Sequence, residues 1–170
     1  MISKKNLVLL GMMGVGKTTV GKYIAKKLKM NFFDIDRVIE KKNNMKINDI
    51  FKKKGEPFFR KEEEKISLEY LNKKNSIISL GGGAFLNIKI RNEVITKTIS
   101  FWLNIDLDTL KYRLKNNKKR PIINKHGLEN IQSIIDKRSK IYSLANYKIK
   151  CEKLKINQIG YKIIKIYEKL

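Results

Sequence analysis

One short stretch near the amino terminus constrains the fold of this chain more than any other. An apolar run at residues 7–10 leads directly into GMMGVGKT at residues 11–18, and a pattern typical of a helix follows at once. A Gly-x-x-x-x-Gly-Lys-Thr segment between a strand and a helix is the phosphate-binding P-loop. A glycine-rich turn ahead of an ordinary helix is the alternative, but it does not require both flanks to fit. We therefore predict a site for a nucleoside triphosphate.

Each residue type in this loop has a physical task. Glycines let the main chain turn tightly and bring its N–H groups close to phosphate oxygens, and the start of the next helix adds a partial positive charge. Lys17 is expected to neutralise the β- and γ-phosphates, and the hydroxyl of Thr18 to bind Mg²⁺. The loop therefore predicts both a nucleotide and a metal ion.

Length and composition predict one domain in a reducing compartment. The chain has 170 residues, of which 42% are hydrophobic, enough for one core and too apolar for a disordered chain. The single cysteine, Cys151, cannot form an internal disulfide, and no apolar run approaches the roughly twenty residues that a membrane helix needs. We expect a cytoplasmic monomer without a membrane partner.

The formal net charge of +23 suggests nucleic acid as a partner, but the distribution of the charge favours another reading. Of 39 basic residues only six are arginine, and the lysines are scattered along every predicted helix and loop. This pattern favours compositional drift toward lysine, so we expect no specific nucleic-acid partner; a nucleic-acid-binding NTPase remains the alternative. The scarce arginines are then candidates for bidentate binding of carboxylate or phosphate.

Hydrophobic periodicity predicts strands that alternate with helices. The expected strands cover residues 5–10, 32–36, 76–80, 98–103 and 147–151. The expected helices cover 17–29, 36–43, 47–54, 58–74, 87–95, 106–117, 128–144 and 156–169, with a break at 55–57. The buried side of helix 128–144 is expected to carry Ile134, Ile135, Ile141 and Leu144. Such alternation is typical of an α/β three-layer sandwich, a five-stranded parallel sheet with helices on both faces.

Two carboxylates, Asp34 and Asp36, end the second predicted strand. Residues i and i+2 of a strand point to the same side, and the carboxyl ends of strands are where open α/β sheets bind ligands. The alternative is a pair of solvated caps for helix 36–43, which Asp36 could begin. Because no aspartate follows the third strand, we assign the metal role to Asp34.

Two further features point to an anionic ligand. Arg60 lies at the start of helix 58–74, where a cation is unfavourable to the helix dipole, although pairing with Glu63 or Glu64 would also explain it. Three consecutive glycines, residues 81–83, follow the third strand and could offer bare N–H groups to an anion or simply form a flexible turn. A polar, cationic segment that ends in Arg120 and Pro121 is typical of a loop over a site.

In order and spacing, these features resemble the shikimate kinase family along essentially the whole chain. The matching motifs are the P-loop, Asp34-x-Asp36, Phe59-Arg60-x-x-Glu63, Gly81-Gly82-Gly83, Arg120-Pro121 and Arg138-x-x-x-Tyr142. The resemblance implies a sheet in the order 2-3-1-4-5 within one domain, 1–170, with substrate-binding helices at about 36–62 and a closing lid at about 115–127. It also implies ATP-dependent phosphorylation of the 3-hydroxyl of shikimate, a step of aromatic amino acid biosynthesis.

For the donor half, the resemblance implies phosphate contacts from the P-loop and its helix, at Gly14, Val15, Gly16, Lys17, Thr18 and Thr19. Thr18 would bind Mg²⁺ and Asp34 would support the ion through water. Arg113 resembles an arginine that stacks on adenine, and Arg120 would swing from the lid onto the phosphates.

For the acceptor half, the resemblance implies that Asp36 binds the 3-hydroxyl as a base or an orienting group. The remaining substrate contacts would come from Arg60, Gly81, Gly82, Gly83 and Arg138, with the two arginines on the carboxylate. Lys17, Asp36 and Arg120 are thus the predicted catalytic residues. A kinase of another polyol, such as gluconate, is the alternative, but it should lack the paired arginines at positions 60 and 138.

Overall fold

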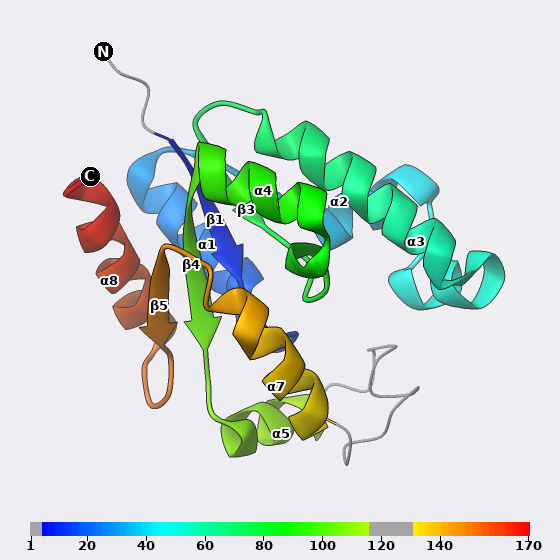
Figure 1. The fold of residues 1–170 in the computed structure, drawn as a ribbon. Coiled ribbons are helices and arrows are strands. Elements are labelled where there is room, and N and C mark those ends of the chain that lie inside the picture. Colours follow the sequence, from blue (N-terminus) through cyan, green and yellow to red (C-terminus); the bar gives the residue numbers. More distant parts are fainter. Residues whose placement is uncertain (1–4, 116–130) are drawn as a thin grey trace.

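The computed structural model describes residues 5–115 and 131–170, and a parallel five-stranded sheet forms its centre (Figure 1). The strands are β1 Asn6–Leu10, β2 Asn31–Asp34, β3 Ser76–Ser79, β4 Thr98–Asn104 and β5 Tyr147–Lys150. They lie in the order β2-β3-β1-β4-β5, and every neighbouring pair is parallel. The predicted fold class and strand order are therefore confirmed.

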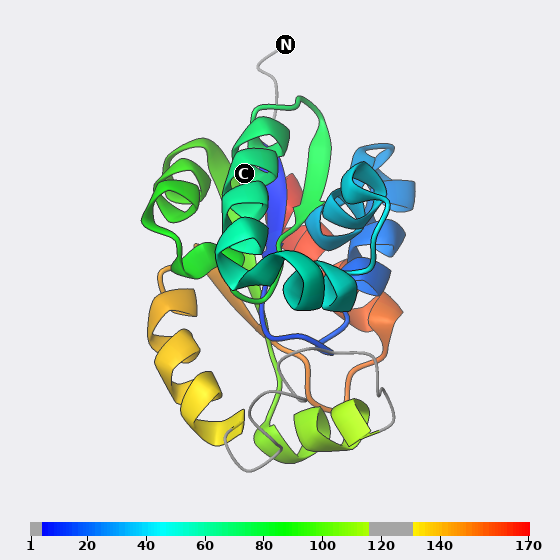
Figure 2. The same cartoon turned by 90° about the vertical axis from the view of Figure 1, so that its right-hand side faces the viewer.

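Helices cover both faces of this sheet, as Figure 2 shows from the side. They are α1 Lys17–Leu28, α2 Ile35–Asn43, α3 Ile47–Leu71, α4 Ile88–Lys97, α5 Leu107–Lys115, α7 Ile131–Tyr142 and α8 Ile156–Glu168, with a 3₁₀ turn, η1, at Ala84–Leu86. Helix α1 packs against α8 on one face, and α4 packs against α3 and β4 on the other. Among the described residues, no helix is both long and apolar enough to span a membrane.

The central strand is the most deeply buried element. All five residues of β1 are buried, because β3 and β4 pair with it on either side and helices cover both faces. Each buried leucine of this strand contributes ~1.5–3 kcal/mol relative to an exposed one. The loop that follows β1 therefore starts from a rigid base.

The strand order creates a crevice at the carboxyl end of the sheet. From β1 the chain runs to β2 and β3 on one side, and it then crosses to β4 and β5 on the other side. Loops that leave adjacent strands in opposite directions diverge, and ligands bind in the space between them. The N–H of Leu80 donates to the carbonyl of Leu9 at 3.2 Å, which holds the segment after β3 beside the P-loop.

The second strand is shorter than predicted, and this changes the reading of its two aspartates. Strand β2 ends at Asp34, whose side chain accepts a hydrogen bond from the Arg37 N–H (3.4 Å) and caps α2. Asp36 lies in the first turn of that helix, so the argument from strand alternation is wrong, as is the expectation that Asp36 begins the helix. A cap needs an extended backbone with its carboxylate over the free N–H groups of the first turn, and Asp34 meets that need.

A sharp kink divides α3 where the sequence predicts a break. Gly55 has φ 81° and ψ 167°, which lies outside the helical region and is reached easily only by glycine. Pro57 follows in the first turn of the second segment, where a missing N–H costs little. The predicted break at residues 55–57 is confirmed, and α3 packs against α2.

The buried side of α7 differs from the prediction at its end. Ile134, Ile135 and Ile141 pack against the core, but Leu144 is 51% exposed because the helix already ends at Tyr142. The side chains that α7 buries most completely are Ile131, Arg138 and Tyr142. A buried arginine on this helix indicates a role beyond packing, since arginine is almost never fully buried without a partner.

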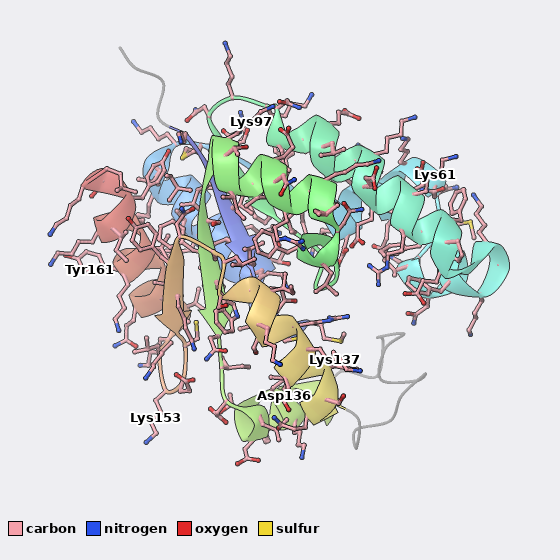
Figure 3. All side chains as sticks on the ribbon, viewed as in Figure 1. Lys61, Lys97, Asp136, Lys137, Lys153 and Tyr161 are labelled. Atoms are coloured by element: carbon pink, nitrogen blue, oxygen red, sulfur yellow. The ribbon has the colours of Figure 1, made fainter. Side chains whose placement is uncertain are left out.

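Lysines are exposed on many separate elements. Lys61 on α3, Lys97 at the end of α4, Lys137 on α7 and Lys153 after β5 are all exposed and point outward in different directions (Figure 3). The scattered lysine distribution predicted from the sequence is confirmed for these four residues.

Candidate active site

The P-loop connects β1 to α1, and its glycines hold backbone conformations that other residues rarely adopt. Gly11, Gly14 and Gly16 have φ values of 138°, 80° and 103°. At Gly11 a side chain is also excluded sterically, because a Cβ would lie 2.5 Å from the Leu103 carbonyl oxygen. The motif therefore has the tight, side-chain-free turn that a phosphate cradle needs.

Lys17 begins α1 and folds back over the loop. Its ammonium Nζ donates to the carbonyl oxygens of Gly11 (2.7 Å) and Met12 (3.0 Å). The first turn of α1 contains no acidic residue, so the positive end of the helix dipole is not offset there. The loop thus presents a lysine and a helix amino terminus where phosphates would bind.

Thr18 and Asp34 bring two oxygen ligands together from different elements. The Thr18 hydroxyl Oγ1, in the first turn of α1, forms a hydrogen bond with Asp34 Oδ2 at the end of β2. Hydroxyl and carboxylate oxygens are the ligands that Mg²⁺ prefers, and this ion usually keeps several waters and takes further oxygens from phosphate. Among the described residues no group of three or more His, Cys, Asp or Glu side chains could hold a metal. The donor set therefore fits an ion shared with a nucleotide.

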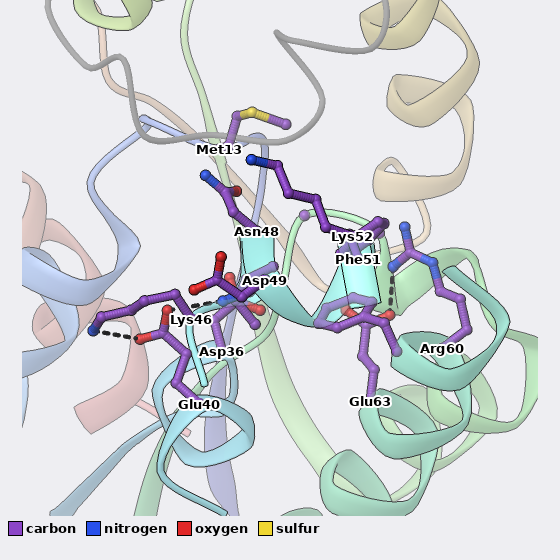
Figure 4. Close-up of a pocket in the computed structure, with 14 residues that line it drawn as sticks. Met13, Asp36, Glu40, Lys46, Asn48, Asp49, Phe51, Lys52, Arg60 and Glu63 are labelled. Carbon is purple, nitrogen blue, oxygen red and sulfur yellow. Dashed lines mark hydrogen bonds and ion pairs between the residues drawn. The ribbon is translucent and has the colours of Figure 1, made fainter. Parts of the chain in front are cut away.

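A cavity of about 610 Å³ lies between the P-loop, α2 and α3 (Figure 4). Its volume is in the range of small-molecule sites. Its lining combines charged and apolar side chains, with Asp36, Arg60, Glu63, Gly82, Gly83, Met13, Ile47, Phe51 and Phe59 among its residues. The cavity thus suits a small molecule that carries both polar groups and a ring.

Two carboxylates meet at Gly81. A Cβ on this glycine would lie 2.6 Å from Glu63 Oε1 and 2.7 Å from Asp36 Oδ1. Burial raises the pKa of Glu63, and the negative charge of Asp36 adds to this, whereas Arg60 and Arg138 oppose it. A glycine at position 81 therefore makes room for two acidic groups at the edge of the cavity.

Arg60 is held by two glutamates of its own helix. Its Nη1 donates to Glu63 Oε2 at 2.6 Å and its Nη2 to Glu56 Oε1 at 3.3 Å. Burial works against the charge, but these two ion pairs outweigh it and raise the pKa of Arg60. The pairing with Glu63 expected as an alternative is present, while Glu64 pairs with Lys89 instead. Arg60 also lines the cavity, so these ion pairs hold its guanidinium at the cavity wall.

Arg138 reaches the same segment from α7. It is only 7% exposed, and its Nη1 lies 3.8 Å from Met12 Sδ. A Cβ on Gly82 would come within 3.2 Å of this nitrogen, and a Cβ on Gly83 within 2.6 Å of Arg60 Nη1. The two arginines thus approach neighbouring glycines from different helices.

Space, and not an unusual backbone conformation, explains the three glycines. None of residues 81–83 is among the positive-φ glycines of the described chain. Instead, each missing Cβ leaves room for charged side chains: Asp36 and Glu63 at Gly81, Arg138 at Gly82 and Arg60 at Gly83. The sequence indicates a site at these glycines but not this reason for them.

The side chains of two predicted donor-side residues, Arg113 and Arg120, lie outside those that the structure describes. Arg113 belongs to α5, and Arg120 with nearly all of the predicted lid at 115–127 lies outside the described residues. Thr19 lies in the first turn of α1 and is exposed. The structure therefore brings together the P-loop, Asp34, Asp36, Arg60, the glycines and Arg138.

Sequence reasoning gave no role to two residues that hold the segment after β3, Tyr142 at the glycines and Arg91 at η1. Tyr142 donates its phenol O–H to the carbonyl of Gly82. Arg91 donates through Nη1 to the carbonyls of Phe85 (3.1 Å) and Leu86 (3.0 Å) in η1. The spacing of Arg138 and Tyr142, one helical turn apart, was the signal available for Tyr142.

The P-loop lies at the switch point of a parallel sheet, beside a cavity that Asp36, Arg60 and Glu63 line and with Arg138 against Gly82 of its wall. This arrangement defines a P-loop kinase that acts on a small molecule. The family model for shikimate kinase matches residues 13–168. The chain belongs to the shikimate kinase family.

Known relatives agree with this assignment. A shikimate kinase of Sulfurihydrogenibium sp. (strain YO3AOP1) is 41% identical over 160 residues, which cover 94% of this chain and 96% of the relative. The solved shikimate kinase from Acinetobacter baumannii in complex with shikimate has a TM-score of 0.92 at 29% identity and covers 97% of this chain and 93% of its own. That from Aquifex aeolicus has a TM-score of 0.85 at 33% identity and covers 96% of each chain.

Proposed function

We propose that this chain transfers the γ-phosphoryl group of ATP to the 3-hydroxyl of shikimate, forming shikimate 3-phosphate for aromatic amino acid biosynthesis. The observation that carries the proposal is the cavity of about 610 Å³ beside the P-loop, where Asp36 and Arg60 line the wall. A small hydroxylated carboxylate is the kind of acceptor that these groups recognise. Membership of the shikimate kinase family supports shikimate as that acceptor.

In the donor half, the P-loop and the first turn of α1 bind the phosphates of ATP. The backbone N–H groups from Gly14 to Thr19 and the ammonium of Lys17 supply the positive potential. Lys17 leaves its contacts with the Gly11 and Met12 carbonyls for the β- and γ-phosphates when nucleotide binds. Arg113 stacks on the adenine ring, and Arg120 adds a charge on the phosphates.

The metal ion belongs to the same half of the site. Thr18 and Asp34, whose side chains form a hydrogen bond with each other, would hold Mg²⁺, with the Thr18 hydroxyl as a ligand and Asp34 supporting the ion through water. When bound, Mg²⁺ offsets the negative charge that builds up on the phosphates during transfer. Asp34 also caps α2, so the carboxylate that would support the ion also holds the start of the helix that carries Asp36.

In the acceptor half, Asp36 accepts a hydrogen bond from the 3-hydroxyl. This bond orients the hydroxyl oxygen toward the γ-phosphoryl group that it attacks. Arg60 and Arg138 bind the ring carboxylate as charge-assisted pairs, the stronger class of hydrogen bond. Gly81, Gly82 and Gly83 let the ring lie against the main chain. These contacts hold the acceptor in line with the γ-phosphate.

Catalysis then rests on positioning and charge neutralisation, because phosphoryl transfer needs little covalent help from the protein. Lys17 and Arg120 act on the charge of the transferring group, and an arginine in this role is worth ~10³–10⁵ in rate in related systems. Asp36 takes up or orients the hydroxyl proton. We assign the reaction to a monomer in the cytoplasm, where the lone cysteine, Cys151, remains reduced.

A coupled assay of ADP release tests the proposal. Shikimate should be turned over with Mg²⁺ and ATP, whereas gluconate and nucleoside monophosphates should not, since neither class offers a ring carboxylate to Arg60 and Arg138. Phosphorus NMR of the product should show a new phosphate ester on shikimate. As a control, Lys17→Met should remove activity with every acceptor. Faster turnover of gluconate than of shikimate would contradict the assignment.

A further inference from the structure

We infer that Tyr142 is a positioning residue of the acceptor site, which sets the direction of the Gly82–Gly83 peptide and so the shape of the surface on which the acceptor lies. This inference rests on the proposed function for its kinetic part only. It starts from a problem that the sequence poses: three glycines in a row lose more conformational freedom on folding than any other tripeptide. Something must hold them in one conformation.

Local turns hold two of the three glycine carbonyls. The N–H of Ala84 donates to the Gly81 carbonyl at 3.1 Å, and the N–H of Leu86 donates to the Gly83 carbonyl at 3.0 Å. The carbonyl of Gly82 is held instead by the phenol of Tyr142, which lies sixty residues further along the chain. In the described part of the chain, this side-chain bond is the long-range anchor of the glycine segment.

The anchor has a direction. In a planar trans peptide the carbonyl and the N–H point opposite ways, so the bond that turns the Gly82 carbonyl toward α7 turns the Gly83 N–H away from it. Gly82 and Gly83 both line the cavity, and the space beside Gly83 is filled by the guanidinium of Arg60. The Tyr142 bond therefore decides which backbone groups face the acceptor.

Tyr142 is itself fixed by its surroundings. It is 1% exposed, and its ring packs against Trp102 with 5.8 Å between ring centroids. Burial raises its pKa to about 12, with the charge of Arg138 opposing and that of Glu63 adding to the shift. The phenol thus remains a donor throughout the physiological pH range.

Arg138 and Tyr142 act on one glycine from one helix face. They are four residues apart on α7, so they lie one above the other. Arg138 occupies the space beside the Cα of Gly82, and Tyr142 holds its carbonyl. The acceptor-binding arginine and the glycine surface are consequently kept in register by the same element.

The chain offers a matched control in Tyr167 on α8. This tyrosine is also buried, at 4% exposure, and its phenol also donates to a backbone carbonyl, that of Lys5, at 2.7 Å. Lys5 precedes β1, at the end of the sheet opposite to the carboxyl ends where the cavity lies. Tyr167→Phe therefore removes the same kind of bond without touching the acceptor site.

The test compares Tyr142→Phe, Tyr167→Phe and the unmodified protein in two measurements. In steady-state kinetics, Tyr142→Phe should raise KM for shikimate about tenfold, the expected effect of leaving a buried carbonyl unpaired, and keep KM for ATP within about twofold. Tyr167→Phe should change neither constant. In amide hydrogen exchange, the amides of Ala84 and Leu86 should exchange about tenfold faster in Tyr142→Phe and at an unchanged rate in Tyr167→Phe.

An unchanged KM for shikimate in Tyr142→Phe, or unchanged exchange at Ala84 and Leu86, overturns the inference. Equal effects of the two substitutions on KM would also overturn it, since the role of Tyr142 would then be stability alone. Failure of the unmodified chain to phosphorylate shikimate would defeat the proposed function instead. In that case the exchange comparison still decides whether Tyr142 anchors the glycine segment.

Discussion

Replacing Gly83 by alanine should weaken shikimate binding strongly and leave the fold intact. Gly83 has φ −104° and ψ −15°, which any residue adopts without strain. The new methyl group would lie 2.6 Å from Arg60 Nη1, 3.0 Å from Nη2 and 3.1 Å from Cζ, whereas ordinary contacts begin near 3.4 Å. The guanidinium must therefore withdraw by about 0.8 Å, the difference between 2.6 and 3.4 Å.

The size of the effect follows from what this displacement changes. A group misplaced by about 1 Å can cost ~10² in rate or binding, so KM for shikimate should rise by ~10- to 100-fold. Stability should change little, because the Arg60 side chain is 35% exposed and has room to move. Alanine in place of glycine also stabilises a compatible position by ~0.4–1 kcal/mol through the unfolded state. The melting temperature should therefore stay within a few degrees of that of the unmodified protein, because a change of about 1 kcal/mol shifts it by roughly 2–8 °C in single domains.

The assay is ADP release at saturating ATP with shikimate varied, together with thermal unfolding. Gly160→Ala on α8 is the control, since its methyl would meet the ring of Tyr23, within 2.7 Å of Cε1, at the interface of α1 and α8. That variant should lose stability and keep its KM for shikimate. A KM within about twofold of the unmodified value in Gly83→Ala would refute the reasoning, because a displaced Arg60 could not then be a carboxylate ligand.

Three further perturbations test other parts of the site. Thr18→Val removes the hydroxyl that is hydrogen-bonded to Asp34, so it should lower kcat ~10²-fold or more and raise the Mg²⁺ concentration needed for activity. A titration of activity against Mg²⁺ measures both effects, and normal turnover at low Mg²⁺ would contradict the metal role of Thr18. Because burial raises the pKa of Glu63, its contribution to stability is complete below the unfolded pKa of ~4.3 and is lost as pH rises through the folded value. In Glu63→Gln, the free energy of unfolding should therefore fall less as pH rises above ~4.3, as urea titrations at several pH values would measure. An unchanged pH profile would contradict a raised pKa of Glu63. Lys52 is exposed at the cavity wall, so Lys52→Ala should raise KM for shikimate about two- to fivefold at low salt and leave it unchanged at ~0.5 M salt. Lys53 lies outside this lining, so Lys53→Ala should leave KM unchanged at both salt concentrations, and equal effects of the two substitutions would exclude a local role of Lys52.

Much of the candidate site could be predicted because its signals are local. The P-loop needs eight consecutive residues between a strand and a helix, and that spacing is visible in one dimension. The break at Gly55 and Pro57 was equally readable, since both residues act on the backbone where they stand. Helix and strand order followed from hydrophobic periodicity, whereas the order of strands in the sheet came with the family resemblance.

Errors arose where two local rules competed. Asp34 and Asp36 fit both a strand end and a helix start, and the sequence does not say where one element gives way to the other. The helix begins at Ile35, so the two carboxylates have different tasks, one against Thr18 and one in the cavity. Leu144 was misjudged for a similar reason, because helical periodicity was extended past the end of α7.

The sequence by itself determined that this chain has a nucleotide-binding loop on an α/β sheet and which charged residues are candidates for its site. Only the tertiary structure decided why residues 81–83 are glycines and what Tyr142 does. Each answer depends on atoms that packing brings together from distant parts of the chain: Asp36 and Glu63 at Gly81, Arg138 and Tyr142 at Gly82. A sequence pattern records the preferences of a residue and its near neighbours, whereas the space left by a missing side chain exists only once the helices have packed around it.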